Sequence, residues 1–480
     1  MTTDQPDRPT TDPAETDQPA PDQPDPAGTG AASNAAVSSG TAGLQRTLGL
    51  RAALGIGMGT MIGAGIFVFP GLAGGEAGPA ASLSFALGGV IALLVALPAS
   101  ELATAMPRSG GGYVFVSRGL GTRWGSLVGF GQWVGLVFAS AFYLSAAGDY
   151  LLDSAERLGM TVPFEGAWVG FTLAVILSGI SLVGTRNTGR LQNGILAVLG
   201  LLLIAFLAWA GLALADVVPG PPTVDQSFFS EGGAPVFTAA ALVFTSYLGF
   251  AQIAAVAGEI REPERNVPRA MVGSVLLVMA AYVATMLVAT SWLSVDRMAE
   301  LGETAMIEVA RLLAGPLGVI GFLACGMLAT LSSANASILS SSRSMFALGR
   351  DGLVPDGVGA VNERFRTPHV ALLLAGGPIA ILTLVGPLDV LAEVASLLHL
   401  VLYGLMCFSL IAFRRRDPET YRPTFTCPGY PWVPILGGVA SLSLILLMNP
   451  LSQVIGGAVL LVALAWTGIY APDVRLKETP

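Results

Sequence analysis

Apolar segments of roughly 20 residues recur along the chain, and they constrain its fold more than any other feature. A helix of this length crosses the roughly 30 Å hydrocarbon core of a bilayer. Only 12% of the 480 residues are charged, whereas about 25% are charged in soluble domains. The sequence therefore predicts an all-α, polytopic membrane protein.

We expect twelve transmembrane helices, one for each apolar segment. These lie at residues 49–73, 79–104, 124–152, 166–184, 194–216, 234–257, 270–293, 316–347, 368–386, 388–412, 431–449 and 452–470. Of the 24 lysines and arginines, all but Arg157, Arg297 and Arg311 fall on the side that holds both termini. Because cytoplasmic loops are enriched in positive charge, we expect a multi-pass plasma-membrane protein with cytoplasmic N- and C-termini.

Residues 1–44 have a different composition from the rest of the chain. Seven acidic residues stand here among Pro, Thr, Gln and Gly, with Arg8 as the only cationic residue. A segment this poor in apolar residues cannot bury enough surface to fold, so we expect a disordered, acidic cytoplasmic tail. The three cysteines of the chain have no paired spacing, and we expect neither a disulfide nor a metal site.

The first apolar segment carries five glycines between Gly55 and Phe69. Each glycine weakens a helix interior by about 1 kcal/mol relative to alanine, so the cluster indicates either close helix packing or a broken helix. A broken membrane helix is tolerated only where protein or a polar cavity receives its free backbone groups. The sixth segment is also interrupted, by polar residues and glycine at 244–250.

The two interruptions correspond in position if helices 1–5 and 6–10 form two halves. Because each half has an odd number of helices, the second half is inverted, and matched interruptions in inverted halves point to a transporter's binding site. We expect a first inverted repeat at 45–216, an external loop at 217–233 and a second repeat at 234–413. Residues 414–480 then hold a cytoplasmic linker, helices 11 and 12 and a short cytoplasmic tail.

Several motifs resemble those of the amino acid–polyamine–organocation (APC) permeases and occur in that family's order. They are GMGTMIGAGIF (57–67), AGPAASLSF (77–85), ELATAMPRSGGGYVF (101–115), FTSYLGFAQIAAVAGEIREPERNVPRA (244–270), SSANASILSSSRSMFALGRDGLVP (332–355) and FRTPHVALLL (365–374). The resemblance implies a leucine-transporter-like fold of five plus five helices, with helices 1 and 6 broken and two further helices, that works by alternating access.

The resemblance also implies a substrate site made largely of backbone atoms. The substrate carboxylate would meet N–H groups at the break of helix 1, and its amine would meet carbonyls of helices 1 and 6. This agrees with the partial positive charge at the start of a helix. Tyr247 or Phe250 would act as a gate, while Gly249 would permit unwinding. The implied substrate-binding residues are Met61, Ile62, Gly63, Ala64, Gly65, Ile66, Phe244, Ser246, Tyr247, Gly249 and Phe250.

Two sets of residues are candidates for ion coupling. In related carriers, hydroxyls on helix 8 help to bind sodium, and Ser332 and Ser333 fall at that position. His399 lies midway along helix 10 and is the candidate for proton coupling, although a histidine bonded to a neighbouring helix is the alternative. Some proton-coupled relatives use a lysine on helix 5 as the proton switch. This mechanism is excluded here because the only lysine, Lys477, lies in the C-terminal tail. We expect no cofactor beyond a coupling Na⁺ or H⁺.

The glutamates Glu101 and Glu393 lie near helix ends, where we expect them to be hydrated. The pocket segments contain no Asp or Glu, which favours a neutral amino acid as the substrate. Two alternatives stay open: an amino acid exchanger without ion coupling, and a polyamine or organocation permease. We find no Walker motif, metal-ligand cluster or nucleophile set, so we expect no enzyme activity. The expected partners are a small-molecule amino acid and the lipid bilayer, with no nucleic acid.

Overall fold

A computed structural model describes residues 48–106, 111–157, 159–161, 163–183, 188–362, 367–416 and 421–470. The predicted acidic tail at 1–44 lies outside these ranges, and so does the C-terminal segment 471–480. Within the described ranges, the regular structure is helical apart from one isolated bridge between Leu48 and Ile260.

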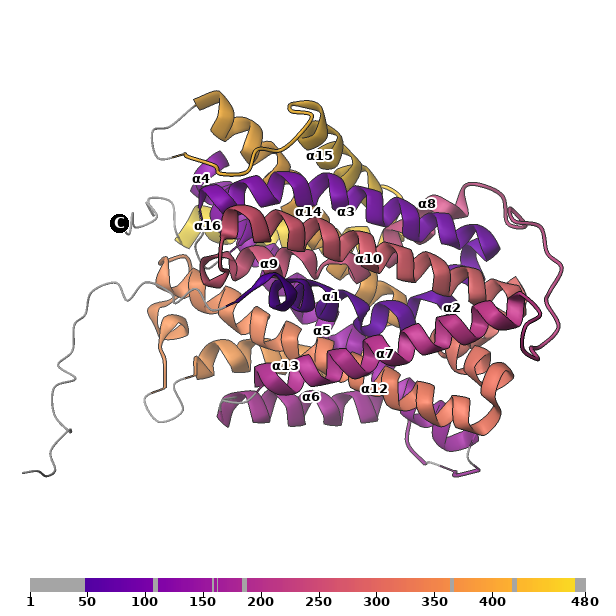
Figure 1. Ribbon diagram of the computed structural model, residues 1–480. Coiled ribbons are helices and arrows are strands. Elements are labelled where there is room, and N and C mark those ends of the chain that lie inside the picture. The colour runs from indigo at the N-terminus through magenta and orange to yellow at the C-terminus, as the bar shows by residue number, and fades with distance from the viewer. Residues whose placement is uncertain are drawn as a thin grey trace, which may run out of the picture. The chain divides into compact units, whose positions relative to one another are not determined.

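Sixteen α-helices and five short 3₁₀-helices follow one another along the described chain (Figure 1). The α-helices are α1 (Leu50–Phe67), α2 (Phe69–Ala77), α3 (Ala81–Ala105), α4 (Gly112–Leu120), α5 (Thr122–Arg157), α6 (Gly166–Val183), α7 (Thr188–Leu214), α8 (Pro235–Val243), α9 (Phe250–Ala255), α10 (Pro263–Trp292), α11 (Val295–Leu301), α12 (Ala305–Arg350), α13 (His369–Val385), α14 (Leu388–Arg416), α15 (Trp432–Ile445) and α16 (Pro450–Tyr470). The 3₁₀-helices are η1 (Gly78–Ala80), η2 (Phe244–Tyr247), η3 (Ala257–Glu259), η4 (Gly302–Thr304) and η5 (Asp356–Gly359).

Eight helices of the described chain are long and apolar enough to cross a membrane, and four more apolar helices are shorter. Each apolar segment predicted from the sequence holds one of these twelve helices. Large apolar side chains also lie on the outside, for example Leu201 at 68% and Ile204 at 67% exposed on α7. Such exposure is unfavourable in water and suits a lipid environment, so the chain is a polytopic membrane protein.

Two of the long helices contain a residue with non-helical backbone angles. In α1 this residue is Gly63 (φ −36°, ψ −119°), which divides the helix near the predicted break. In α12 it is Gly315 (φ +59°), a left-handed conformation that suits glycine. Pro316 follows directly, and it is the residue at which the eighth predicted apolar segment begins.

The long helices pack mainly against helices that are distant in the sequence. The α3 helix packs along α10, and Figure 1 shows the two side by side. The α5 helix packs against α12, and α6 packs against α13. The α1 helix lies between α10 and α12 and also contacts η2 and α9. These contacts bring the interruption of α1 next to that of the sixth apolar segment, which is formed by α8, η2 and α9.

The expectation that Glu101 and Glu393 are hydrated is wrong. Glu101 is fully buried and accepts two bonds from Arg414, from Nε at 2.8 Å and from Nη2 at 2.6 Å. It also accepts hydrogen bonds from the Tyr421 hydroxyl (2.8 Å) and the Cys427 backbone N–H (2.6 Å). Glu393 is buried too and accepts from the N–H of Asn449 at 3.0 Å. Glu101 is sheltered because the loop from Tyr421 onward folds back over the end of α3.

This buried carboxylate affects the residues of the loop that lie around it. Burial, together with the charge of Glu101, raises the pKa of the Cys427 thiol to about 12. Burial and the hydrogen bond to Glu101 raise the pKa of the Tyr421 hydroxyl. Both groups are therefore protonated and neutral at physiological pH.

Candidate functional site

The interruption of α1 lies directly against α12. A Cβ atom at Gly63 would collide with the Ser333 hydroxyl oxygen and would lie 2.8 Å from the Ser333 Cβ. Two carbon atoms that are not bonded cannot approach so closely, so this position requires a glycine. The glycine thereby gives the backbone of α1 direct access to the hydroxyl of Ser333.

The two serines proposed for a cation site are both buried on α12. Ser333 is 2% exposed and Ser332 is 9% exposed. Ser333 Oγ has no hydrogen-bond partner among the residues that the structure describes. A buried hydroxyl without a partner is costly, and an oxygen ligand of this kind suits a hard cation such as sodium.

The tyrosine Tyr282 of α10 joins the two interruptions. Its hydroxyl donates to the carbonyl of Met61 in α1, and the carbonyl of Ser246 in η2 lies 3.2 Å away as a second acceptor. A Cβ atom at Gly65 would lie 2.6 Å from the Tyr282 Cζ and 2.9 Å from the Ser246 Cβ. Gly65 therefore leaves the space that this tyrosine occupies. Sequence reasoning missed Tyr282, and its only signal was a polar aromatic inside an apolar segment.

The interruption of the sixth segment is a tight 3₁₀ turn rather than an unwound stretch. The N–H of Leu248 donates to the carbonyl of Thr245 at 3.3 Å. Gly249 has helical angles (φ −65°, ψ −27°), so the expectation that it permits unwinding is wrong. Gly249 instead makes room for α1, because a Cβ atom there would lie 2.7 Å from the Met61 Cγ.

The predicted aromatic residues are fully buried in this conformation. The Tyr247 hydroxyl donates to the carbonyl of Phe85 at 2.8 Å, which ties η2 to α3. The Phe250 and Phe244 rings pack on Tyr403 of α14, with centroids at 5.0 and 6.2 Å. Each of these side chains would have to move before it could cover or release a substrate.

The remaining predicted residues lie in α1 on either side of Gly63. Met61, Ile62 and Ile66 are buried in the core. Ala64 lies in the same helix, and its side chain is outside the described part of the structure. The structure therefore brings together Met61, Gly63, Gly65, Ser246, Gly249 and Ser333, which come from three separate segments of the chain.

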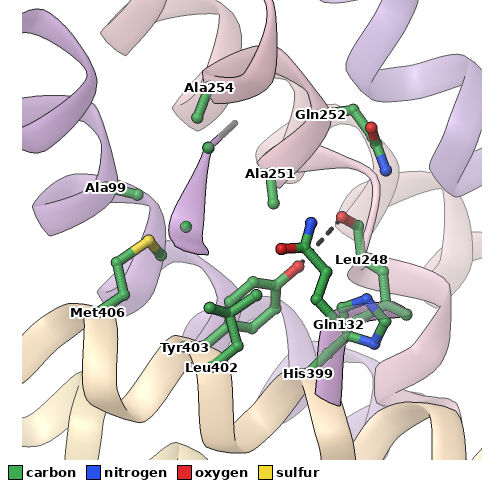
Figure 2. Close-up of a pocket in the computed structure, with 12 residues that line it drawn as sticks. Ala99, Gln132, Leu248, Ala251, Gln252, Ala254, His399, Leu402, Tyr403 and Met406 are labelled. Atoms are coloured by element: carbon green, nitrogen blue, oxygen red, sulfur yellow. Dashed lines mark hydrogen bonds between the residues drawn. The ribbon is translucent and has the colours of Figure 1, made fainter. Parts of the chain in front are cut away.

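His399 lines a small cavity beside the sixth segment (Figure 2). The cavity measures about 20 Å³, which is room for about one water molecule. In Figure 2, the Tyr403 hydroxyl is directed at the carbonyl of Leu248, and the distance is 3.1 Å. Gln132 and Gln252 supply further polar groups.

The Nδ1 atom of His399 lies 2.8 Å from the carbonyl of Ala395, one turn earlier in the same helix. A carbonyl only accepts hydrogen bonds, so Nδ1 carries a proton and donates it to this carbonyl. The ring also packs on α5, where a Cβ atom at Gly135 would lie 2.7 Å from the His399 Cε1. The bond of Nδ1 therefore lies within α14, whereas the alternative predicted from the sequence was a bond to a neighbouring helix.

Known proteins and a protein family match this sequence over most of its length. The sequence profile of the amino acid permease family matches residues 48–469. The branched-chain amino acid permease BcaP of Bacillus subtilis is 28% identical over 86% of this chain and 90% of its own length. The serine/threonine exchanger SteT of the same organism is 28% identical over 77% of this chain and 84% of its own length. Cationic amino acid transporter 4 of Mus musculus is 29% identical over 74% of this chain and 57% of its own length.

Proposed function

Because the chain belongs to the amino acid permease family, we propose that it is a secondary transporter that carries neutral amino acids across the plasma membrane by alternating access. One observation carries this proposal. Two interrupted helices meet at a single place, and the Tyr282 hydroxyl bridges a carbonyl from each. The same place holds Gly63, whose missing side chain exposes backbone to the neighbouring helix.

The proposed architecture has twelve membrane crossings, with ten of them in two inverted halves. The packing supports it, because helices pair with their counterparts from the other half. Helix 2 (α3) packs on helix 7 (α10), helix 3 (α5) on helix 8 (α12), and helix 4 (α6) on helix 9 (α13). Helix 1 (α1) likewise contacts the interrupted helix 6 at η2 and α9. Pairs of this kind are expected around a pseudo-two-fold axis in the membrane plane.

The proposed chemistry uses both ends of the substrate. We propose that the N–H groups after Gly63, at the start of the second half of α1, and the partial positive charge of a helix start attract the carboxylate. The carbonyls of Met61 and Ser246 are the proposed partners of the ammonium. In the described conformation Tyr282 occupies these carbonyls, so the incoming ammonium must displace its hydroxyl.

A neutral side chain is favoured because the interrupted segments 61–66 and 244–250 contain no Asp or Glu. A cationic side chain buried at this depth would need such a partner. The relatives BcaP and SteT are named for neutral amino acids, which agrees with this choice. Cationic amino acid transporter 4 is named for cationic amino acids, so a cationic amino acid is the alternative substrate.

Transport has two candidate coupling ions, Na⁺ and H⁺, and exchange without an ion is the alternative. Ser333 favours sodium, because its buried hydroxyl faces the interruption of α1 and has no partner within the described chain. His399 is the candidate for proton coupling, and it is the weaker one because its Nδ1 already bonds to the carbonyl of Ala395. Exchange without an ion is the alternative, and the relative SteT is named as an exchanger.

Alternating access needs one closed and one open side. On the proposed outer side, α2 packs so closely on α11 and η4 that a Cβ atom at Gly75 would lie 2.7 Å from the Ala299 Cα. On the proposed cytoplasmic side, a cavity of about 360 Å³ opens between α5, α9 and α12. The described conformation is therefore assigned as inward-facing.

Uptake of a labelled amino acid panel into proteoliposomes tests the proposal. Separate sodium and pH gradients, and vesicles preloaded with amino acid, distinguish symport from exchange. We expect saturable uptake of neutral amino acids that other neutral amino acids inhibit. Exclusive uptake of arginine, lysine or a polyamine would overturn the substrate class, and no uptake of any panel member would overturn the proposed function.

A further inference from the structure

The cavity on the proposed cytoplasmic side is lined by charged and polar groups from several elements. At about 360 Å³, it lies within the size range of small-molecule sites, which is about 300–1,000 Å³. Its polar lining includes Gln132, Gln252, Glu259, Ser340, Arg343 and Ser344. This is enough space and polarity for an entire amino acid.

Two opposite charges in this cavity have no side-chain partner among the residues that the structure describes. Arg343 of α12 and Glu259 of η3 make no side-chain hydrogen bond or ion pair with any residue that the structure describes, and they do not pair with each other. The cavity's other arginine, Arg350, lies 3.9 Å from a carboxylate oxygen of Asp351. Asp351 also accepts a hydrogen bond from the Tyr113 hydroxyl at 2.8 Å.

The cavity adjoins the route to the interrupted helices. Gln132 and Gln252 line both this cavity and the smaller one that reaches Leu248, His399 and Tyr403. A solute that leaves the interruption of the sixth segment toward the cytoplasm would therefore pass between these two amides before it reaches Arg343 and Glu259.

We propose that Arg343 and Glu259 form a second amino acid site, at which a substrate zwitterion rests between the central site and the cytoplasm. The planar guanidinium of Arg343 binds the α-carboxylate, and the carboxylate of Glu259 binds the ammonium. This inference rests on the proposed transport function and adds a position on the transport path. A bound zwitterion pairs with both charges at once. Neither charge has such a partner among the residues that the structure describes.

The test measures the half-saturating concentration of L-leucine from each side of the membrane. Inside-out vesicles report binding from the cytoplasmic face, and right-side-out vesicles report binding from the outer face. Arg343→Gln and Glu259→Gln should each raise the cytoplasmic value at least fivefold and leave the outer value within twofold. Two matched controls, Arg350→Gln in the same cavity and the exposed Glu264→Gln on α10, should leave both values unchanged.

A double variant separates this site from a gate in which the two residues pair directly with each other. If each residue holds one end of the substrate, the double variant binds leucine more weakly than either single variant. If they pair directly, the double variant is no worse than either single variant, and the proposal is overturned. It is equally overturned if the wild-type protein transports leucine while both single variants match it on both sides. Absence of leucine transport by the wild type would count against the proposed function instead.

Discussion

Tyr282 offers the sharpest test of how the two interruptions work together. Its hydroxyl donates to the carbonyl of Met61 and lies 3.2 Å from that of Ser246. Replacing Tyr282 with phenylalanine keeps the ring and leaves these buried carbonyls without that donor. An unsatisfied buried acceptor costs about 1–3 kcal/mol, so the substrate-free variant should unfold at a lower temperature than the wild type.

The same change should strengthen substrate binding. On the proposed binding mode, the ammonium displaces the Tyr282 hydroxyl in the wild type, whereas in the variant it meets carbonyls that this hydroxyl no longer occupies. A gain of about 1–3 kcal/mol corresponds to a dissociation constant for L-leucine that is lower by about 5- to 150-fold. Thermal unfolding of the detergent-solubilised protein, followed across a leucine titration, measures both quantities.

Tyr150→Phe is the matched control for this experiment. The Tyr150 hydroxyl also donates to a carbonyl of α1, but that carbonyl belongs to Phe67, beyond the interruption. The control should lose stability to a similar extent without any gain in leucine affinity. The reasoning is refuted if Tyr282→Phe weakens leucine binding, because the hydroxyl would then be a direct substrate contact.

Three further substitutions test separate parts of the structure. Gly63→Leu should abolish leucine uptake at unchanged membrane abundance because its side chain would collide with Ser333, whereas Gly211→Leu on the exposed side of α7, with open space around it, should not. If a sodium gradient drives uptake, Ser333→Ala should remove that dependence, and full sodium stimulation in the variant would exclude the hydroxyl as a ligand. Glu101→Gln breaks a buried ion pair and should cost about 3–5 kcal/mol in thermal unfolding. It should also speed maleimide labelling of Cys427, because the thiol with a pKa of about 12 is protonated at pH 8 and loses a nearby negative charge; unchanged labelling would contradict this.

The sequence predicts the membrane helices well because hydropathy over 20 residues is a local property. The interruption in α1 and the altered geometry of the sixth segment are also marked locally, by glycine and polar residues. The glycines are harder to interpret, since a glycine that allows an unusual backbone looks the same as one that makes room for a neighbour. Gly249 is the second kind.

The residues that sequence reasoning missed are those whose roles depend on distant partners. Tyr282 bonds to a carbonyl 221 positions away, and Glu101 bonds to an arginine 313 positions away. Nothing in the local pattern around Tyr282 shows which backbone groups its hydroxyl reaches. Burial of Glu101 likewise depends on a loop that follows α14, so its position at a helix end suggested hydration instead.

The central claim is that the protein recognises the α-carboxylate and the ammonium of its substrate. Competition by substrate analogues tests this claim most directly. Uptake of labelled L-leucine into proteoliposomes is measured against unlabelled leucine, leucine methyl ester and isoamylamine. The ester lacks the carboxylate charge, and the amine lacks the carboxylate altogether. We predict that only leucine competes at low concentration, because both ends of the zwitterion are needed at the interruptions of α1 and the sixth segment. Equal competition by the ester or the amine would contradict this account.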